Sequence, residues 1–254
     1  MAFKKTKDHL KILLLQIRDG PKVRQEEHES FAQYSGLRLE QITILNVFDS
    51  PNFSTNIIND YDALFVGGAS EASVLEPETY PFIQTSIDLL KHCLNINLPV
   101  FASCFGFQLA AIAFGRKTCN LKNANSTEII PDVKNPIIDL LPEQKQETDM
   151  GGSLRLGANE IKINQDSLAY KIYNSNKISK RHRHRYEFNT KYREEFLKNG
   201  MIFSGESDNG KRMEILEIPS HKFFFGVQFH PEFNSRPGFP EQAFKSFVTA
   251  SSQN

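Results

Sequence analysis

Short apolar runs alternate with helix-like patterns along the first half of the chain. Residues 11–17 read KILLLQI, and the next segment has Pro21 where a helix would begin and Gly36 where it would end. This alternation is typical of βα units, whose parallel strands form a sheet covered by helices. We therefore expect an α/β fold with a mostly parallel central sheet flanked by helices, of flavodoxin-like type. Further strands are predicted at 41–47, 63–66 and 98–102, and further helices at 79–95 and 105–114.

The second half of the chain has a different character. Residues 153–163, 201–204 and 213–218 favour antiparallel strands, and 167–173 and 240–248 favour short helices. The polar segment 142–149 is expected to be an exposed loop. Because no Pro/Ser/Gly-rich linker or internal repeat interrupts the chain, we predict a single domain over residues 1–254 with an added antiparallel portion.

Composition excludes several classes of partner. Thirty basic and thirty acidic residues give a formal net charge of zero, so we expect no nucleic-acid partner and no membrane partner. The apolar run at 12–15 is far shorter than the ~20 residues that span a bilayer, and polar residues follow it where a signal peptide would be cleaved. Three cysteines without a CxxC pair indicate a reducing compartment, hence the cytoplasm.

The strongest chemical motif surrounds Cys104. In VFASCFGFQLAA, residues 100–111, a buried strand turns abruptly into a helix at Cys104, and Gly106 follows. This pattern is a nucleophile elbow with sulfur in place of the serine oxygen. Amides at the helix N-terminus favour the thiolate and a developing oxyanion. Taken alone, the motif also fits a buried cysteine that only fills space.

Two further motifs have the geometry to assist a thiol. In VQFHPEF, residues 227–233, Pro231 favours extended backbone at His230, so His230 and Glu232 are expected on one side as a base and its carboxylate partner. A surface turn is the alternative. Gly67 and Gly68 end the strand at 63–66, where backbone N–H groups can face a ligand as oxyanion donors beside the Phe105 amide.

This order of motifs, Gly-Gly, cysteine elbow and His-Pro-Glu, resembles that of the class I glutamine amidotransferases. The later half is similar to the glutaminase domain of CTP synthase, an enzyme of pyrimidine biosynthesis. The strings that carry this resemblance are NANSTEIIPD at 123–132, TDMGGSLRLG at 148–157, KRHRHRYEFN at 180–189 and VQFHPEFNSRP at 227–237. The first hundred residues resemble the family only in layout.

The resemblance implies a role for each matching residue. Cys104 is then the nucleophile, His230 the base and Glu232 its partner, with the oxyanion on the amides of Gly68 and Phe105. The implied glutamine pocket comprises Gly67, Gln108, Glu128 and Arg185, with Glu128 on the α-ammonium group. The family uses no metal or other cofactor in this step. The implied partners are L-glutamine and a separate synthetase that accepts ammonia.

The chain also departs from the family pattern. Ala102 stands where the elbow usually has glycine, and Phe105 and Phe107 replace leucine and methionine. The segment after Gly68 lacks the glycine- and arginine-containing lid of CTP synthase, and the amidoligase half is missing. We therefore expect little response to GTP and no binding of UTP or ATP in the family manner.

Two further motifs fit known binding sites less well. GESDNGKR, 205–212, is close to a phosphate loop, but Arg212 replaces the required hydroxyl and a strand pattern follows. RHRHR, 181–185, is better explained by glutamine recognition and surface packing than by nucleic acid or metal binding. The alternatives to a glutaminase are a γ-glutamyl peptidase or hydrolase with the same triad, and a regulatory homologue without turnover.

Overall fold

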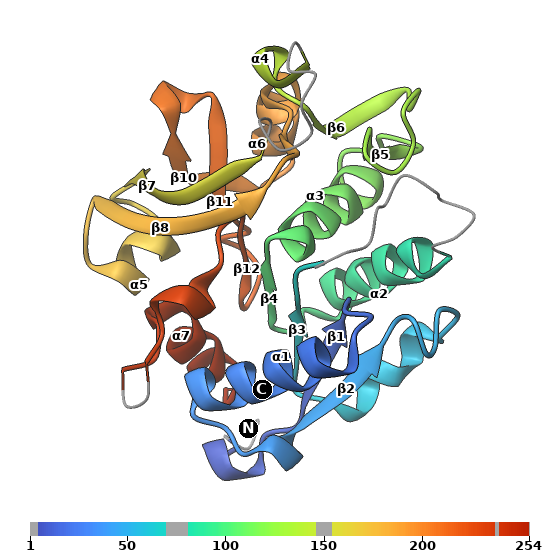
Figure 1. Ribbon diagram of the computed structural model, residues 1–254, viewed down its shortest axis with the longest axis vertical. Helices are drawn as coiled ribbons and strands as arrows, with labels where there is room; N and C mark the ends of the chain where they lie inside the picture. Colours follow the sequence, from blue (N-terminus) through green and yellow to red (C-terminus); the bar gives the residue numbers. More distant parts are fainter. Residues whose placement is uncertain (1–4, 70–80, 146–153, 237–238, 254) are drawn as a thin grey trace.

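The computed structural model describes residues 5–69, 81–145, 154–236 and 239–253. These residues form a nine-stranded sheet with strand order β2-β1-β3-β4-β12-β11-β10-β7-β8 (Figure 1). Its first five strands in this order pair in parallel. They are β2 (Ile42–Asn46), β1 (Ile12–Gln16), β3 (Ala63–Val66), β4 (Val100–Ser103) and β12 (Phe224–Val227).

The remaining four strands of this sheet pair in antiparallel fashion. They are β11 (Arg212–Glu217), β10 (Ile202–Ser207), β7 (Arg155–Ile163) and β8 (Lys177–His184). A small second sheet contains β5 (Ala124–Ser126), β6 (Asn135–Asp139) and β9 (Glu187–Phe188). The predicted α/β class, with a mostly parallel part and an antiparallel addition in the later half, is confirmed. That residues 1–254 form a single domain stays a prediction.

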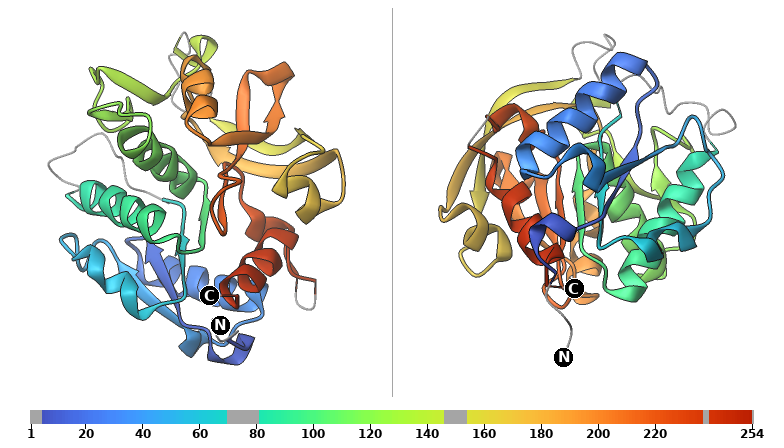
Figure 2. Two further views of the ribbon diagram at one scale, coloured as in Figure 1. Left: turned by 180° about the vertical axis from the view of Figure 1, so that it is seen from behind. Right: turned by 90° about the horizontal axis from the view of Figure 1, so that it is seen from below.

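Helices cover both faces of the parallel strands. On β1, Leu13 and Leu15 face one core cluster, whereas Ile12 and Leu14 face the other. The first cluster packs under α2 (Phe82–Ile96) and α3 (Phe105–Lys117), and the second under α1 (Pro21–Ser35) and α7 (Gln242–Ser251) (Figure 2). Burial on both faces explains why these strands read as continuous apolar runs in the sequence.

Phenylalanine rings form the core beneath α1 and α7. Phe31 of α1 and Phe244 of α7 lie 4.6 Å and 6.0 Å from the ring of Phe65 on β3, between ring centroids. Phe101 of β4 packs edge-on against Phe244 at 5.3 Å. The chain has 21 phenylalanines and no tryptophan, and these rings fix the helices that flank the strand bearing the elbow.

Two predicted boundaries need correction. The segment 142–149 was expected to be a loop, yet residues 142–145 form the short helix α4 (Pro142–Lys145). Pro142 suits the first helical position, and the Gln144 side chain accepts a hydrogen bond from the Leu141 N–H at 2.8 Å. Residues 146–149 lie outside the described part. The helix predicted at 79–95 is α2, which begins at Phe82; residues 79 and 80 are not described.

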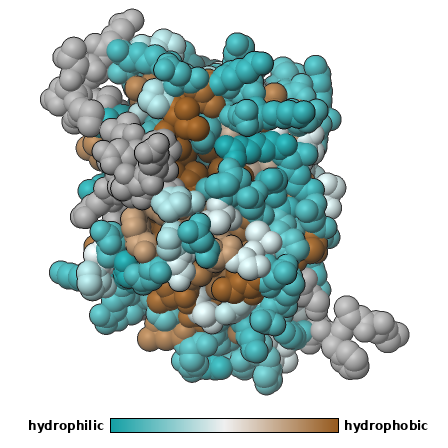
Figure 3. Space-filling view, turned by 90° about the vertical axis from the view of Figure 1, so that its right-hand side faces the viewer, coloured by the Kyte–Doolittle hydropathy of each residue, from teal (hydrophilic) through white to brown (hydrophobic). Residues whose placement is uncertain are grey.

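The other helices are α5 (Leu168–Tyr173) and α6 (Arg193–Lys198). The face shown in Figure 3 is mainly hydrophilic, with hydrophobic side chains gathered in a few spots. Within the described residues, no helix has both the length and the apolar character required to cross a bilayer.

Candidate active site

The carboxyl ends of the parallel strands meet at one edge of the sheet. Arg18 follows β1, Gly67 and Gly68 follow β3, Cys104 follows β4, and His230 lies three residues beyond β12. Sheets of this kind bind ligands at this edge. The chain therefore gathers its predicted catalytic groups at a single place.

Cys104 occupies a strained backbone conformation between β4 and α3. Its φ and ψ are 53° and −109°, which side-chain-bearing residues rarely adopt. The strain is tolerated because the surrounding structure fixes it: the Cys104 N–H donates to the Val227 carbonyl at 2.8 Å. A β-carbon on Gly106 would lie 2.6 Å from the Val66 carbonyl oxygen, so only glycine lets α3 approach β3 this closely. The predicted elbow is thus present.

His230 and Glu232 form a hydrogen-bonded pair beside the elbow. The His230 Nδ1 atom lies 2.6 Å from Glu232 Oε1, and the His230 side chain is only 7% exposed. His230 has the extended backbone that Pro231 was expected to impose. Glu232, however, lies in the 3₁₀ turn Pro231–Asn234, and this turn brings its carboxylate back to the ring.

Charge around the ring determines its protonation. Burial lowers the pKa of His230, but interactions with the Cys104 sulfur and with the Glu232 carboxylate outweigh that effect and raise the pKa above its usual range. For Glu232, burial raises the pKa, and the hydrogen bond and charge of His230 more than offset this and lower it. The site therefore favours an imidazolium at His230 beside a carboxylate at Glu232.

Gly68 lies against the side chains of Cys104 and His230. A β-carbon built on Gly68 would be 3.4 Å from Cys104 Cβ and 3.4 Å from His230 Cε1. Phe105 is the first residue of α3, so its N–H lacks an acceptor within the helix, like the first N–H groups of any helix. The amides proposed from sequence for an oxyanion are thus next to the thiol.

Gln108 connects Cys104 to the segment that contains Arg185. Its Nε2 donates to the Tyr186 carbonyl at 3.1 Å and approaches Gln228 Oε1 at 3.5 Å. Gln228 in turn donates to the Cys104 carbonyl at 3.4 Å. The buried Oε1 of Gln108 has no hydrogen-bond partner within the described residues, which leaves an acceptor for a substrate N–H.

Glu128 and Arg185 lie close enough to interact electrostatically. Burial raises the pKa of the Glu128 carboxyl to about 7, and the Arg185 charge partly offsets that rise. Tyr186 is close to both, since both charges act on its phenol. A carboxylate and a guanidinium at a half-buried position suit the ammonium and carboxylate groups of an amino acid.

The basic run 181–185 and the phosphate-loop-like segment 205–212 belong to strands of the large sheet and their connections. In β8, Arg181 and Arg183 are exposed, whereas His182 and His184 are buried and joined by a 3.1 Å contact between His182 Nδ1 and His184 Nε2. The phosphate-loop-like segment 205–212 is a hairpin between β10 and β11. Among the residues that the structure describes, no group of three or more metal-binding side chains occurs.

Three residues near the site were missed from the sequence. Gln228 bridges Gln108 and Cys104, and Arg18 forms an ion pair with Glu27 of α1 beside Gly67 and Gly68. The position of Arg18 directly after a parallel strand, at the edge where Cys104 was already placed, was the available signal. The sequence contains no comparable signal for Glu27, because this residue lies within an ordinary polar helix.

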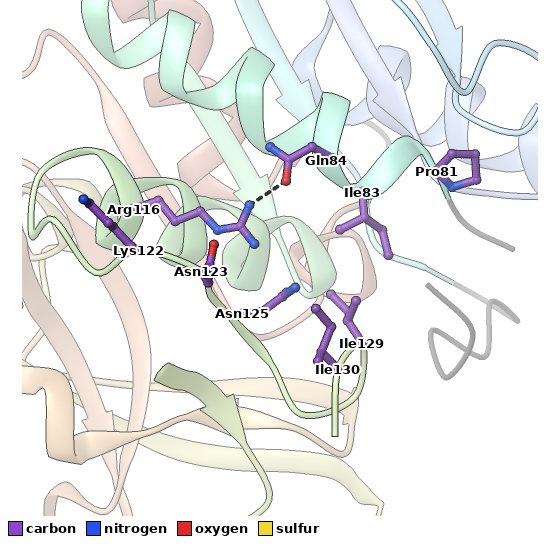
Figure 4. Close-up of a pocket in the computed structure, with 9 residues that line it drawn as sticks. All are labelled: Pro81, Ile83, Gln84, Arg116, Lys122, Asn123, Asn125, Ile129 and Ile130. Carbon is purple, nitrogen blue, oxygen red and sulfur yellow. Dashed lines mark hydrogen bonds between the residues drawn. The ribbon is translucent and has the colours of Figure 1, made fainter. Parts of the chain in front are cut away.

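A cavity of about 630 Å³ lies near Glu128 but does not include the Cys104 site. Its lining includes Asn125, Ile129 and Ile130 from the segment around Glu128, and Arg116 of α3 donates to Gln84 of α2 at its wall (Figure 4). The triad residues and Arg185 are not in its lining. The thiol, not this cavity, therefore marks the candidate site.

The departures at the elbow are accommodated locally. Ala102 pairs in register with Val66 on one side and Gly226 on the other. A β-carbon on Gly226 would come within 3.3 Å of the Phe107 ring, so the missing side chain leaves room for this larger residue. The altered lid after Gly68 falls almost entirely at 70–80, outside the described residues.

Comparisons with known proteins agree with this geometry. The sequence model of the family described as glutamine amidotransferase class-I matches residues 29–250. The chain is 41% identical over 222 residues to CTP synthase of Staphylococcus haemolyticus, which covers 86% of this chain and 40% of that protein. It is 44% identical over 191 residues to CTP synthase of Archaeoglobus fulgidus, covering 75% and 34%. The chain thus spans less than half the length of these relatives.

Among solved structures, the glutaminase domain of Trypanosoma brucei CTPS with bound acivicin superposes with a TM-score of 0.76. The two are 25% identical, and the alignment covers 96% of this chain and 94% of that one. The likeness to the CTP synthase glutaminase domain that the sequence indicated is therefore confirmed, while the roles of individual residues stay predictions. With a family model that extends over most of its length and a cysteine elbow in the expected fold, the chain belongs to the class I glutamine amidotransferases.

Proposed function

We propose that the chain hydrolyses the side-chain amide of L-glutamine to glutamate and ammonia through a γ-glutamyl thioester on Cys104. One observation carries the proposal. Cys104 is held in a strained elbow at the N-terminus of α3, beside a histidine that Glu232 orients through a 2.6 Å contact. That arrangement has the nucleophile, base and orienting group that acyl transfer to sulfur requires.

The first half of the reaction uses the ion pair. The Cys104 thiolate attacks the amide carbon, and the carbonyl oxygen takes up negative charge that the N–H groups of Gly68 and Phe105 stabilise. The His230 imidazolium gives its proton to the departing nitrogen, so that the C–N bond breaks and ammonia leaves. Glu232 stabilises the imidazolium before this transfer and holds the ring in position.

The second half uses neutral His230. The ring accepts a proton from water while the water oxygen attacks the thioester carbon. The C–S bond then breaks, glutamate leaves, and the thiolate and imidazolium are restored. One water molecule is consumed for each glutamine, and no redox step or cofactor is needed.

Substrate recognition rests on two side chains of opposite charge, Glu128 and Arg185. Glu128 binds the α-ammonium group, Arg185 the α-carboxylate, and Gln108 accepts an N–H through its unpartnered oxygen. Gly67 lines the pocket where a side chain would collide with its neighbours. A zwitterion bound in this way places its side-chain amide toward the elbow.

The released ammonia is expected to serve a separate acceptor enzyme. The relatives that the chain resembles are CTP synthases, so a synthetase is the natural acceptor. This partner is inferred from the relatives rather than from a contact in the structure.

The test is to measure glutamate and ammonia together from L-glutamine. We expect equal amounts of both from the wild-type chain, and a loss of about a hundredfold or more in Cys104→Ser, since an alkoxide is much harder to form than a thiolate. A γ-glutamyl dipeptide is the rival substrate. Faster cleavage of the dipeptide than of glutamine would replace this proposal with a peptidase function.

A further inference from the structure

Two charged side chains meet at the edge of the candidate site. Arg18 follows β1 and Glu27 lies in α1, and Arg18 Nε donates to Glu27 Oε1 at 2.8 Å. The two side chains are only 13% and 7% exposed. Both residues precede 29–250, the range that the family model matches. The family comparison therefore assigns them no role.

The pair lies directly against the Gly67-Gly68 turn. A β-carbon on Gly67 would be 2.6 Å from Glu27 Oε1, so the carboxylate occupies the space beside this glycine. A β-carbon on Gly68 would be 3.4 Å from Arg18 Nη2, the same distance as from Cys104 Cβ and His230 Cε1. The guanidinium, the β-carbon of Cys104 and the imidazole of His230 thus all contact the same side of Gly68.

The guanidinium also interacts electrostatically with two carboxylates. Burial raises the pKa of Glu27 despite the nearby charge of Arg18, and the charge of Glu232 raises it further. Arg18 is among the groups that lower the pKa of Glu232, together with His230. Two carboxylates at such a site repel each other unless a cation balances them.

The position of Arg18 is fixed through its backbone. Its carbonyl oxygen accepts hydrogen bonds from Arg24 Nε at 2.9 Å and from Asn46 Nδ2 at 2.9 Å. Asn46 is itself buried and bonded to Gln16 Oε1 at 3.0 Å. A side chain held by its main chain and by Glu27 is pre-organised, unlike the exposed arginines of β8.

We propose that Arg18, held by Glu27, is a positioning residue of the Cys104 site that supports the Gly67-Gly68 turn and balances the charge of Glu232. Through Glu232 it keeps His230 aligned with the thiol, and through Gly68 it fixes one of the two amides proposed for the oxyanion. The catalytic part of this inference rests on the proposed glutaminase function.

A simple structural ion pair between α1 and the sheet is the rival explanation. The two explanations differ when both charges are removed. Arg18→Gln alone leaves Glu27 buried without its cation and is expected to unfold at a lower temperature. The double variant Arg18→Gln with Glu27→Gln removes that penalty, so a purely structural pair predicts wild-type behaviour in every respect.

The experiment measures the rate at which iodoacetamide alkylates Cys104 as a function of pH. Glutamine turnover and the melting temperature are measured for the same variants. The variants are the double variant and Arg18→Lys, which keeps the charge. Asp62→Asn is the matched control, because Asp62 is a buried carboxylate paired with Lys5 at the opposite end of β3. Glu232 acts directly on His230, and Arg18 and Glu27 are coupled to Glu232. The buried rings of His182 and His184 in β8 are coupled to His230 as well.

For the double variant we expect a melting temperature close to wild type, a fall of about tenfold or more in kcat with a smaller change in KM, and an alkylation profile moved to higher pH. A loss of that size is typical when a contact to a charged group disappears. Arg18→Lys should recover part of kcat. Asp62→Asn should leave both kcat and the pH profile of alkylation unchanged. Wild-type kcat and alkylation in the double variant would overturn the inference.

The alkylation profile needs no glutamine, so the two proposals can fail separately. If the wild-type chain does not hydrolyse glutamine but the double variant shifts the pH profile of alkylation, the positioning role of Arg18 is supported and the proposed function is wrong. Normal turnover with an unshifted profile would leave the function standing and remove the role of Arg18.

Discussion

At the scale of single residues, the structure separates one cysteine from the other two. Burial raises the pKa of Cys93 and Cys119 to about 12, whereas Cys104 lies at a helix N-terminus beside His230. A glutamine analogue with an electrophilic carbon in place of the amide should therefore modify Cys104 alone. Peptide mapping by mass spectrometry checks this outcome. Label spread over all three thiols would show that Cys104 has no special reactivity.

Glu128 gives a prediction for pH. Because burial raises the pKa of this carboxyl to about 7, the carboxylate that we propose binds the substrate ammonium forms above that pH and is lost as the pH falls. The KM for glutamine should rise as the pH falls below about 7, with a smaller change in kcat.

Steady-state kinetics from pH 5.5 to 8.5 measure this dependence. In Glu128→Gln, KM should be raised by about tenfold or more, as expected for a lost charge-assisted hydrogen bond, and should no longer vary with pH in this range. Asp132→Asn, at an exposed position in the same segment, is the control. A pH-dependent KM that survives in Glu128→Gln would assign the titration to another group.

At the scale of elements, the elbow depends on close contact between α3 and β3. Gly106→Ala would place a β-carbon 2.6 Å from the Val66 carbonyl oxygen, so the helix must move and carry Cys104 with it. We expect a destabilisation of about 1–3 kcal/mol, the usual range for overpacking, and a large loss of turnover. Thermal unfolding and glutamate release measure the two effects.

Gly20→Ala provides the matched glycine variant. A β-carbon there meets no atom closer than 3.9 Å, and φ is −69°, so both properties should stay near wild type. If Gly106→Ala were as active as Gly20→Ala, close packing of α3 on β3 would not be what positions the thiol.

Much of this element arrangement was predictable, for a physical reason. Strands buried on both faces must be continuous apolar runs, so 63–66 was located to the residue, and Pro21 and Gly36 correctly marked α1. Local patterns did not reveal α4, which depends on the Gln144 contact with the Leu141 N–H. Nor could they pair Arg18 with Glu27, since α1 must first pack on the sheet to bring them together.

At the scale of the whole molecule, the chain aligns with 94% of the glutaminase domain of Trypanosoma brucei CTPS and with 40% of the CTP synthase from Staphylococcus haemolyticus. We propose that the acceptor of the ammonia is a separate protein. Ammonia released without an acceptor is wasted, so we expect the isolated chain to turn over slowly, well below the roughly 10 per second typical of enzymes. No CTP should form from UTP and ATP with this chain alone.

The central claim is that glutamine is cleaved through a thioester on Cys104, and trapping that intermediate tests it most directly. The chain is mixed with isotopically labelled glutamine, quenched in acid within one turnover and mapped by mass spectrometry. The account predicts a labelled γ-glutamyl group on the peptide that contains Cys104, formed together with ammonia and absent from Cys104→Ser. Ammonia release with no label on Cys104, or neither release nor label at high enzyme concentration, would contradict it.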